Sequence, residues 1–301
     1  MSDPAATVSD LESGPESAVE ERRQPGDRAA ARSPAPADVA DVLAGLGASL
    51  RPGELRVIGP IAVPGLAPRR IRIYLPKGSA AVAPRLGLYL FDGQNLFDDG
   101  PSFSGGWHVH ETLEHVARRR RPDAPPLPVV VGIDHGHESR IHELSPFPHG
   151  GEPGRLDRFL AWITGSLMPE LRKELGIVEG PIGAAAGGSS MGGLAALYAH
   201  FRHPEAFGGA LAMSPSVWLA GHAILDWIAA QPAPPVSRIY LDCGAREGRG
   251  ALLPLAARLA ADLAERGYDA DHLMWRPDAR GGHNEASWRR RLPKAMRFMY
   301  R

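Results

Sequence analysis

The stretch IGAAAGGSSMGGLAALYAH, from Ile182 to His200, constrains the fold of this chain more than any other segment. Its first half is a run of alanine and glycine that ends in two adjacent serines, and its second half has the pattern of a helix. Side chains this small allow a helix to approach a strand closely, so the stretch predicts a strand, a tight turn and a helix. Two interpretations are open: a reactive serine on a strained turn, or a small-residue crossover without chemistry.

The turn fits the pattern G-x-S-x-G with Ser190 at its centre. Gly188 and Gly192 stand two residues to either side. A frame centred on Ser189 would place Met191 where glycine is required. A phosphate-binding loop is a weaker interpretation, because no G-x-G-x-x-G follows the first expected strand and no lysine follows the glycines. The pattern therefore favours Ser190 as a nucleophile, activated at the positive end of the following helix.

Strand-like and helix-like segments alternate from about residue 51 onward. Two opening strands, within residues 54–59 and 69–76, suit the antiparallel edge of a sheet, because the second alternates polar and apolar residues. Buried strands are expected within residues 85–93, 127–134, 181–188, 207–214, 237–244 and 269–277. Helices are expected within residues 107–121, 155–176, 193–204 and 252–267, with a closing helix that ends at residue 298. The alternation predicts an α/β protein with a mostly parallel, twisted sheet and helices on both faces, whose chemistry lies at the carboxyl ends of the strands.

The N-terminal 50 residues differ from the rest in composition. Residues 1–36 are rich in Ala, Pro, Ser and mixed charges, with too few apolar residues to offset the entropy of ordering. Residues 37–50 are expected to add one short helix. We therefore expect a disordered or weakly structured extension over residues 1–50 and one domain over residues 51–301.

Composition and charge argue against several classes of partner. The 34 basic residues balance 34 acidic ones, so no excess charge indicates binding to nucleic acid or to an anionic membrane surface. No apolar run approaches the roughly 18 residues of a membrane-spanning helix, and the N-terminus lacks the basic start and apolar core of a secretory signal. The single cysteine, Cys243, leaves no intramolecular disulfide. We expect a cytoplasmic protein with no nucleic-acid or membrane partner, and the sequence leaves its oligomeric state open.

A nucleophilic serine needs a base and an acid that orients the base. His283 lies in a glycine-flanked loop between the last expected strand and the last helix, where a base belongs. Three carboxylates are candidates for the acid: Glu247 just beyond the strand RIYLDCG, Asp242 at the end of that strand, and Asp278. Glu247 is favoured because a carboxylate in a loop can reach a histidine in the adjacent loop.

An oxyanion hole in such a site takes two backbone amides. One comes from the residue after the nucleophile, here Met191, and the other from the loop after an earlier strand. That loop is FDGQNLFDD, so the amide of Gln94 is the expected second donor. The alternative is that DGQN is only a favourable turn.

Five segments together carry a family pattern: LYLFDGQNLFDD, VVVGIDHGHESRIHELSPF, GGSSMGGLAALYAHFRHPEAFGGALAMSPSVW, YLDCGAREG and GGHNEASW. They resemble the "putative esterase" family of α/β-hydrolases. That family contains enterochelin (siderophore) esterases, the feruloyl and acetylxylan esterases of carbohydrate esterase family one, and S-formylglutathione hydrolases. The resemblance covers about residue 51 to the end of the chain.

The resemblance implies an α/β-hydrolase fold for residues 51–301, with Ser190 as nucleophile and His283 as base. It also implies an acid in a G-x-x-D/E turn, which supports Glu247. From this sequence we expect neither the N-terminal β domain of the larger enterochelin esterases nor the secretion signal of a plant-wall esterase. These two differences argue against transferring a substrate from either group.

The loop GIDHGHESRIHEL concentrates histidine and acidic residues, but without standard metal-ligand spacing, so neither a metal nor another cofactor is expected. We expect this loop to line the pocket entrance, with Arg140 binding an anionic or polar part of the substrate. Trp107 is a candidate apolar wall of the pocket; alternatively, it packs in the core at the start of a helix. Trp218 allows the same two interpretations.

These observations favour a serine carboxylic-ester hydrolase that acts on a small or medium ester through an acyl-enzyme. Two other classes stay open. An acyltransferase would use the same fold with an alcohol in place of water, and a non-catalytic binding module would have kept only the fold. The intact serine, acid and histidine set argues against the binding module.

Overall fold

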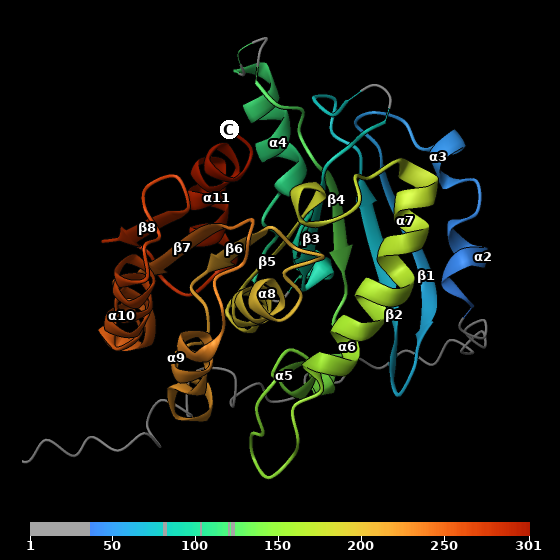
Figure 1. Ribbon diagram of the computed structural model, residues 1–301. Helices are drawn as coiled ribbons and strands as arrows, with labels where there is room; N and C mark the ends of the chain where they lie inside the picture. Colours follow the sequence, from blue (N-terminus) through green and yellow to red (C-terminus); the bar gives the residue numbers. More distant parts are fainter. Residues whose placement is uncertain (1–36, 81–82, 103, 120, 122–123) are drawn as a thin grey trace, which may run out of the picture. The chain divides into compact units, whose positions relative to one another are not determined.

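The computed structural model describes residues 37–80, 83–102, 104–119, 121 and 124–301. Its centre is an eight-stranded sheet in the order β1-β2-β4-β3-β5-β6-β7-β8 (Figure 1). The strands are β1 (Leu55–Val63), β2 (Leu66–Tyr74), β3 (Gly87–Phe91), β4 (Val129–Ile133), β5 (Ala184–Ser189), β6 (Gly209–Met213), β7 (Arg238–Gly244) and β8 (Leu273–Asp278). Each expected strand is present, with ends shifted by a few residues.

The sheet is antiparallel at one edge and parallel elsewhere. β1 pairs with β2, and β2 with β4, in antiparallel fashion. All later pairs are parallel, from β4 with β3 to β7 with β8. The parallel strands are fully buried in β3, β4, β5 and β6, because helices cover both faces. The expected mostly parallel α/β sheet is therefore confirmed.

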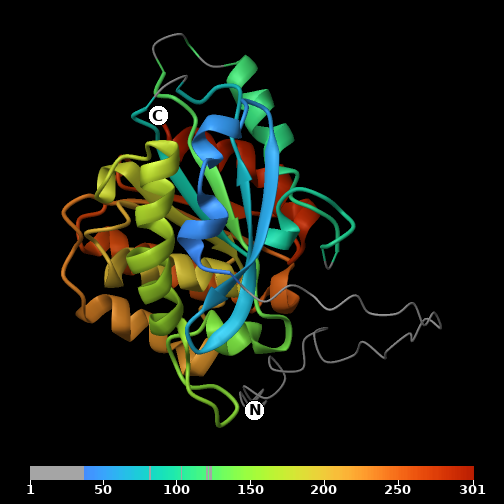
Figure 2. The same cartoon turned by 90° about the vertical axis from the view of Figure 1, so that its right-hand side faces the viewer.

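Helices cover the two faces unequally. The main helices are α2 (Val39–Leu43), α3 (Leu46–Ser49), α4 (Val109–Arg118), α5 (Arg140–Glu143), α6 (Leu156–Trp162), α7 (Met168–Leu175), α8 (Met191–Arg202), α9 (Leu219–Ala230), α10 (Leu252–Glu265) and α11 (Glu285–Met299). Side chains of α4 and α11 form the core on one face, whereas α2, α3 and α6 to α10 contribute to the core on the other. Figure 2 views the sheet from its β1 and β2 side, with α4 and α11 on one side and α6 and α7 on the other.

Strand β3 shows how the two cores arise from one apolar run. Tyr89 and Phe91 belong to the larger core, and Leu88 and Leu90, the residues between and before them, to the smaller one. Successive side chains of a strand point to opposite faces, so a strand buried on both sides needs apolar residues at every position.

Strand β5 consists of alanine, glycine and one serine because α8 and neighbouring strands pack closely against it. A Cβ on Gly187 would lie 2.6 Å from a side-chain atom of Leu90, and one on Gly188 would lie 2.7 Å from the backbone of Gly192. Both distances are too short for real carbon contacts. The small residues therefore fix the path from β5 into α8, which positions the serine turn.

Residues 37–50 extend the domain beyond its expected start at residue 51. They form two short helices, α2 and α3, rather than the single helix expected. Val39, Leu43 and Leu46 are buried in the larger core, and Ala37 forms a parallel bridge with Ile61. The short apolar pattern of this segment was too weak to show that it packs on the sheet. The expected disorder of residues 1–36 lies outside the described residues.

Two helical features differ from the sequence expectation. The helix expected over residues 155–176 is interrupted by a π-helical segment, Ile163–Leu167, between α6 and α7. Thr164 in this segment donates a hydrogen bond from its hydroxyl to the carbonyl of Leu160, and such back-bonding often bends helices. Helix α9 was not predicted.

In the part of the chain that the structure describes, no helix is long and apolar enough to cross a bilayer.

Candidate active site

Ser190 stands on a strained turn between β5 and α8. Its backbone has φ 56° and ψ −122°, a conformation that few residues with a side chain adopt. The backbone N–H of Ser190 donates to the carbonyl of Met213 at 3.0 Å, and its carbonyl accepts from Ser216 and Leu194. These bonds hold the turn in a strained geometry that presents the hydroxyl at the carboxyl edge of the sheet. This is the geometry that the G-x-S-x-G frame requires.

His283 comes from the loop between β8 and α11, and its ring lies beside Ser190. Its Nε2 atom is 2.9 Å from the Oγ of Ser190. The ring packs edge-on against Trp288, with ring centroids 5.1 Å apart. About a third of the side chain is exposed. One side of the ring therefore contacts the buried serine, and the other side reaches solvent.

Glu247 accepts a hydrogen bond from the far side of the histidine ring. Its Oε2 atom lies 2.9 Å from Nδ1 of His283, and the carboxylate is fully buried at the start of the 3₁₀ turn η6 (Glu247–Gly250). Burial acts to raise the pKa of Glu247. Hydrogen bonds from His283, from the Ser214 hydroxyl and from the Gly244 amide outweigh burial, so the pKa is lowered and the carboxylate stays ionised.

Three loops thus bring Ser190, His283 and Glu247 into one hydrogen-bonded line, in the chain order serine, acid, histidine. Each residue follows a different strand of the parallel sheet, at its carboxyl end. Ser189, the alternative nucleophile, is the last residue of β5 and is paired in register with Met213. The line can activate a hydroxyl, because a neutral imidazole with a carboxylate on Nδ1 carries its lone pair on Nε2.

The two other candidate acids occupy different places. Asp242 is fully buried within β7, where it accepts hydrogen bonds from the Ser214 amide and the Tyr240 hydroxyl and forms an ion pair with Arg291. Burial raises the pKa of Asp242 to about 7, against the opposing effect of Arg291. Asp278 instead pairs with Arg290. Neither contact set includes His283, so the geometry favours Glu247 as its partner.

The two amides proposed for an oxyanion hole follow neighbouring strands. Met191 is the first residue of α8, and Gln94 lies in the turn η2 (Gly93–Asn95) after β3, which pairs directly with β5. Asp92, just before this turn, has φ 57°, and a Cβ on Gly93 would lie 2.7 Å from the backbone of Gly132. The turn therefore has a specific, tightly packed conformation, although a role in holding an oxyanion stays a prediction.

The loop after β4 is tied down by ion pairs. Arg140 forms two hydrogen bonds with the carboxylate of Asp92, at 2.8 and 2.9 Å, and so joins this loop to the turn that carries Gln94. Asp134 pairs in the same bidentate way with Arg72. Arg140 was expected to bind substrate; in the structure its charge already faces Asp92, so a substrate contact stays a prediction.

The histidines of this loop do not form a cation site in the structure. His135 accepts a hydrogen bond from the amide of His137, and burial lowers its pKa. Glu143 is buried in an ion pair with Arg69. Among the described residues, no group of three His, Cys, Asp or Glu side chains is placed to hold a metal ion.

Trp107 packs in the core rather than on an open pocket wall. Only 2% of it is exposed, and its ring centroid lies 6.0 Å from that of Trp288, which in turn contacts His283. This is the second of the two sequence interpretations. Trp107 therefore supports Trp288 behind the histidine, and its burial argues against the expected role as a pocket wall. Trp218 is partly buried beside His149.

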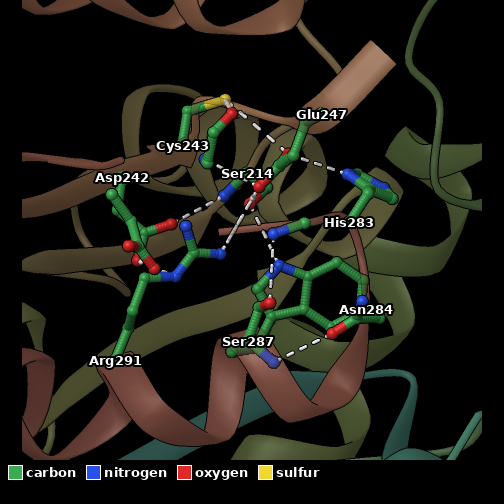
Figure 3. A network of polar contacts seen from close by, with 12 residues as sticks. Ser214, Asp242, Cys243, Glu247, His283, Asn284, Ser287 and Arg291 are labelled. Carbon is green, nitrogen blue, oxygen red and sulfur yellow. Dashed lines mark hydrogen bonds and ion pairs between the residues drawn. The ribbon is translucent and has the colours of Figure 1, made fainter. Parts of the chain in front are cut away.

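Four residues of the site were missed in the sequence. Ser214 and Ser216 follow β6 in the segment SPSV; the hydroxyl of Ser216 is 3.3 Å from that of Ser190, and Ser214 donates to Glu247. Trp288 and Arg291 come from α11 and both donate to Ser214. Figure 3 shows Arg291 pointing toward Ser214. The signal for the serines was their position at a strand end beside the nucleophile. The sequence held no such signal for the arginine, because it stands in the run WRRR, where an arginine is usually solvated.

Comparisons with known proteins agree with this fold. The uncharacterized protein YbbA of Bacillus subtilis is 24% identical over 246 residues, which cover 77% of this chain and 92% of YbbA. An iron(III) enterobactin esterase of Escherichia coli O6:H1 is 29% identical over 228 residues, which cover 73% of this chain and 51% of that protein. This chain therefore spans about half the length of that esterase. The crystal structure of the BES protein from Bacillus cereus has a TM-score of 0.64 at 21% identity, covering 82% of this chain and 94% of that one.

The sequence model of a family described as "Putative esterase" matches residues 67–299, which include nearly all of β2, strands β3 to β8 and helices α4 to α11. The family resemblance noted in the sequence is thereby confirmed. Because the match extends over most of the chain, the protein belongs to this family of carboxylic-ester hydrolases with the α/β-hydrolase fold.

Proposed function

We propose that the protein is a serine esterase that works through an acyl-enzyme. Ser190 is the nucleophile, His283 the general base and Glu247 the acid that orients the base. The observation that carries this proposal is the pair of 2.9 Å contacts that join Ser190 to His283 and His283 to Glu247. Helix packing and core burial account for small residues at the turn, but they do not require a histidine and a buried glutamate to line up behind the serine.

The acylation step follows from these contacts. Nε2 of His283 takes the proton of the Ser190 hydroxyl as Oγ attacks the acyl carbon of the ester. Glu247 stabilises the imidazolium that forms, without taking its proton. The oxyanion of the tetrahedral intermediate is held by the amides of Met191 and Gln94. Its collapse breaks the ester bond, the imidazolium gives its proton to the leaving alcohol, and an acyl-Ser190 ester remains.

Water completes the reaction by the same groups in reverse order. His283 removes a proton from a water molecule, the resulting hydroxide attacks the acyl carbon, and Ser190 regains its proton as the carboxylic acid leaves. One base therefore serves both half-reactions. No metal or redox cofactor takes part in this scheme.

The proposed substrate is a carboxylic ester of small or medium size. The matched E. coli relative is named for iron(III) enterobactin, but this chain spans about half of it. A screen of the purified protein with short p-nitrophenyl esters, feruloyl esters, S-formylglutathione and a catecholate trilactone tests the class. Turnover of any of these esters supports the proposal, and hydrolysis of the trilactone at the highest kcat/KM would place the protein with the siderophore esterases.

The covalent intermediate gives a direct test of mechanism. Rapid mixing with an activated ester should release a burst of alcohol, and mass spectrometry of acid-quenched protein should find the acyl group on the peptide that contains Ser190. An acyl group on a different peptide would contradict the proposal. So would a variant with slowed deacylation that still hydrolyses the ester but never carries an acyl group.

A further inference from the structure

Behind Glu247, on the side away from His283, lies a buried cluster of polar side chains (Figure 3). Its members are Ser214, Asp242, Glu247 and Arg291, none more than 8% exposed. Two carboxylates and one guanidinium therefore share a space that water scarcely enters. A buried charge is stable only when it is paired and hydrogen-bonded, so the arrangement of this cluster decides which carboxylate carries charge.

The hydroxyl of Ser214 fixes the direction of the hydrogen bonds. It lies 3.0 Å from Nε1 of Trp288 and 2.9 Å from an Nη atom of Arg291. Indole and guanidinium groups only donate, so both lone pairs of the hydroxyl are occupied. Its single hydrogen must then point to its remaining partner, Oε1 of Glu247, at 2.6 Å. The cluster thus directs one donor at one oxygen of the glutamate.

The two oxygens of Glu247 consequently have separate tasks. Oε1 accepts from the Ser214 hydroxyl and, at 2.7 Å, from the Gly244 amide. Oε2 accepts from Nδ1 of His283. With Oε1 anchored on one side, the carboxylate cannot rotate without breaking two hydrogen bonds, and Oε2 stays aimed at the imidazole.

Arg291 also lies between the two carboxylates. Its Nε atom is 3.3 Å from Asp242, and an Nη atom is 3.5 Å from Glu247. The three groups sum to one negative charge when both carboxylates are ionised. Without the guanidinium, two buried carboxylates would face each other, and such pairs retain a proton to a higher pH than a single carboxylate does.

We propose that Arg291 is a positioning residue of the active site, whose buried guanidinium offsets the charge of Asp242 and so keeps Glu247 ionised and aligned on His283. This inference rests on the proposed serine-esterase mechanism. It assigns Arg291 no contact with substrate.

The test uses pH profiles, so the titratable groups around the cluster matter. They are Tyr240, Asp242 and Cys243 from β7, Glu247 from η6, Asp278 from the end of β8, and His283 and Arg291 from the loop and helix that follow β8. Of these, Asp242 and Glu247 are the groups whose charge Arg291 controls, since burial raises the pKa of both Tyr240 and Cys243 out of the working range.

The first variant, Arg291→Met, removes the charge and keeps most of the volume. We expect kcat/KM on an activated ester to fall about 10- to 100-fold at pH 7.5, the size known for hydrogen-bond partners behind metal-binding histidines. We also expect the acid limb of the kcat/KM profile to move to higher pH by about one unit or more. A second proton must then leave the carboxylate pair before Glu247 carries its charge.

A double variant, Arg291→Met with Asp242→Asn, restores the charge balance. It leaves one negative charge on Glu247, as in the native cluster, so the acid limb should return to within a few tenths of a pH unit of its native position. Arg291→Lys keeps the charge and should also hold the limb in place, with a smaller loss of kcat/KM than Arg291→Met. If Arg291→Met alone does not fold, the acid limb of the double variant can still be compared with that of the native protein.

The control is Arg289→Met, on the same helix but exposed, which should leave kcat/KM and the profile unchanged. A purely structural role for Arg291 predicts that Arg291→Met lowers the melting temperature and the activity but leaves the acid limb of the kcat/KM profile in place. It also predicts no rescue by Asp242→Asn. That result would overturn the inference. So would a folded double variant with no activity. Absence of ester turnover in the native protein would instead refute the proposed function, and the two failures are therefore distinguishable.

Discussion

The two edges of the parallel sheet differ: one borders the larger cavity, and the other carries the proposed catalytic residues. At the amino-terminal edge, the first residues of β3, β5, β6 and β7 help to line a cavity of about 480 Å³. At the carboxyl edge, each loop after β3 to β7 contains a non-glycine residue with positive φ: Asp92, His137, Ser190, Ser214 and Arg249. Such residues cost roughly 1–3 kcal/mol each and persist only where their surroundings enforce them.

The comparison shows that volume alone does not locate a reactive site in this fold. Glycine, proline and alanine make up nearly half of the residues that line the cavity, and side chains such as His272 and Arg301 are paired to neighbouring aspartates. The carboxyl edge instead has buried polar side chains that converge on a serine hydroxyl. We infer that strained loops and converging donors mark the chemistry, and the following experiments test this contrast.

The largest effect is expected for Ser190→Ala. Loss of a triad nucleophile removes on the order of 10⁶ in kcat, whereas the alanine should fit the turn and leave the melting temperature about unchanged. Steady-state kinetics on one activated ester measures the effect. Ser189→Ala is the matched control and should keep most of the activity; the reverse result would move the nucleophile by one residue.

Next in size is Glu247→Gln, with an expected loss of about 10³- to 10⁴-fold in kcat/KM. The amide cannot stabilise the imidazolium that forms as Ser190 loses its proton. Asp242→Asn, five residues earlier, should keep kcat/KM within about tenfold, because Asp242 reaches the histidine only through the cluster. If Asp242→Asn abolished turnover at an unchanged melting point while Glu247→Gln stayed active, the assignment of the acid would be wrong. If neither mattered, Ser190 and His283 would work as a dyad.

A smaller effect is expected for Gly188→Ala, which tests the packing beneath the nucleophile. The new Cβ would meet the backbone of Gly192 at 2.7 Å, so strand and helix must separate. Overpacking of this kind costs about 1–3 kcal/mol of unfolding free energy, and we expect kcat/KM to fall with it. Gly100→Ala, where nothing lies within 4 Å of the new Cβ, is the control for both measurements. Equal behaviour of the two variants would contradict the account of the small-residue strand.

Asp242 should also make stability depend on pH. Its pKa rises from an ordinary 3.8 to about 7 on folding, so the folded state binds this proton more tightly than the unfolded state does. The contribution of the group to stability therefore decreases as pH rises from about 4 to about 7. The melting temperature of the native protein, relative to that of Asp242→Asn, should be higher at pH 5.5 than at pH 8. A constant difference across this range would contradict the burial of an ionising Asp242.

The smallest effect is expected at the amino-terminal edge. Ile182 is 73% exposed beside the cavity, and Ile182→Ala should change kcat/KM by less than about twofold. Kinetics on the same ester and a thermal melt measure the result. A tenfold loss of activity at an unchanged melting point would show that the cavity takes part in the reaction, and the contrast between the two edges would fail.

The sheet could be predicted from sequence because a buried parallel strand requires a continuous apolar run. The serine turn could be recognised in the sequence for a related reason, since the close packing of α8 on β5 leaves room for very small residues only. The roles of Ser190, His283 and Glu247 stay predictions, although the structure brings these three side chains together as expected.

What the sequence did not reveal depends on contacts between distant segments. Ser214 ends an expected strand, but nothing local indicates its contact with Glu247, and Arg291 stands in the run WRRR, where an arginine is usually solvated. Only the packing of α11 against the sheet shows that this arginine is buried. Trp107 was ambiguous for the same reason, because an aromatic residue near a strand end suits a pocket wall or a core equally well.

The separation of the reacting groups along the chain also affects how activity appears during refolding. The turn that carries Ser190 is local, since β5 and α8 adjoin, but His283 is 93 residues away from it. Closing so long a loop is entropically costly until the intervening strands have docked. We expect the helical circular dichroism signal to recover before ester hydrolysis does. The moment at which hydrolysis first appears then marks the docking of β8 and α11 on the rest of the sheet.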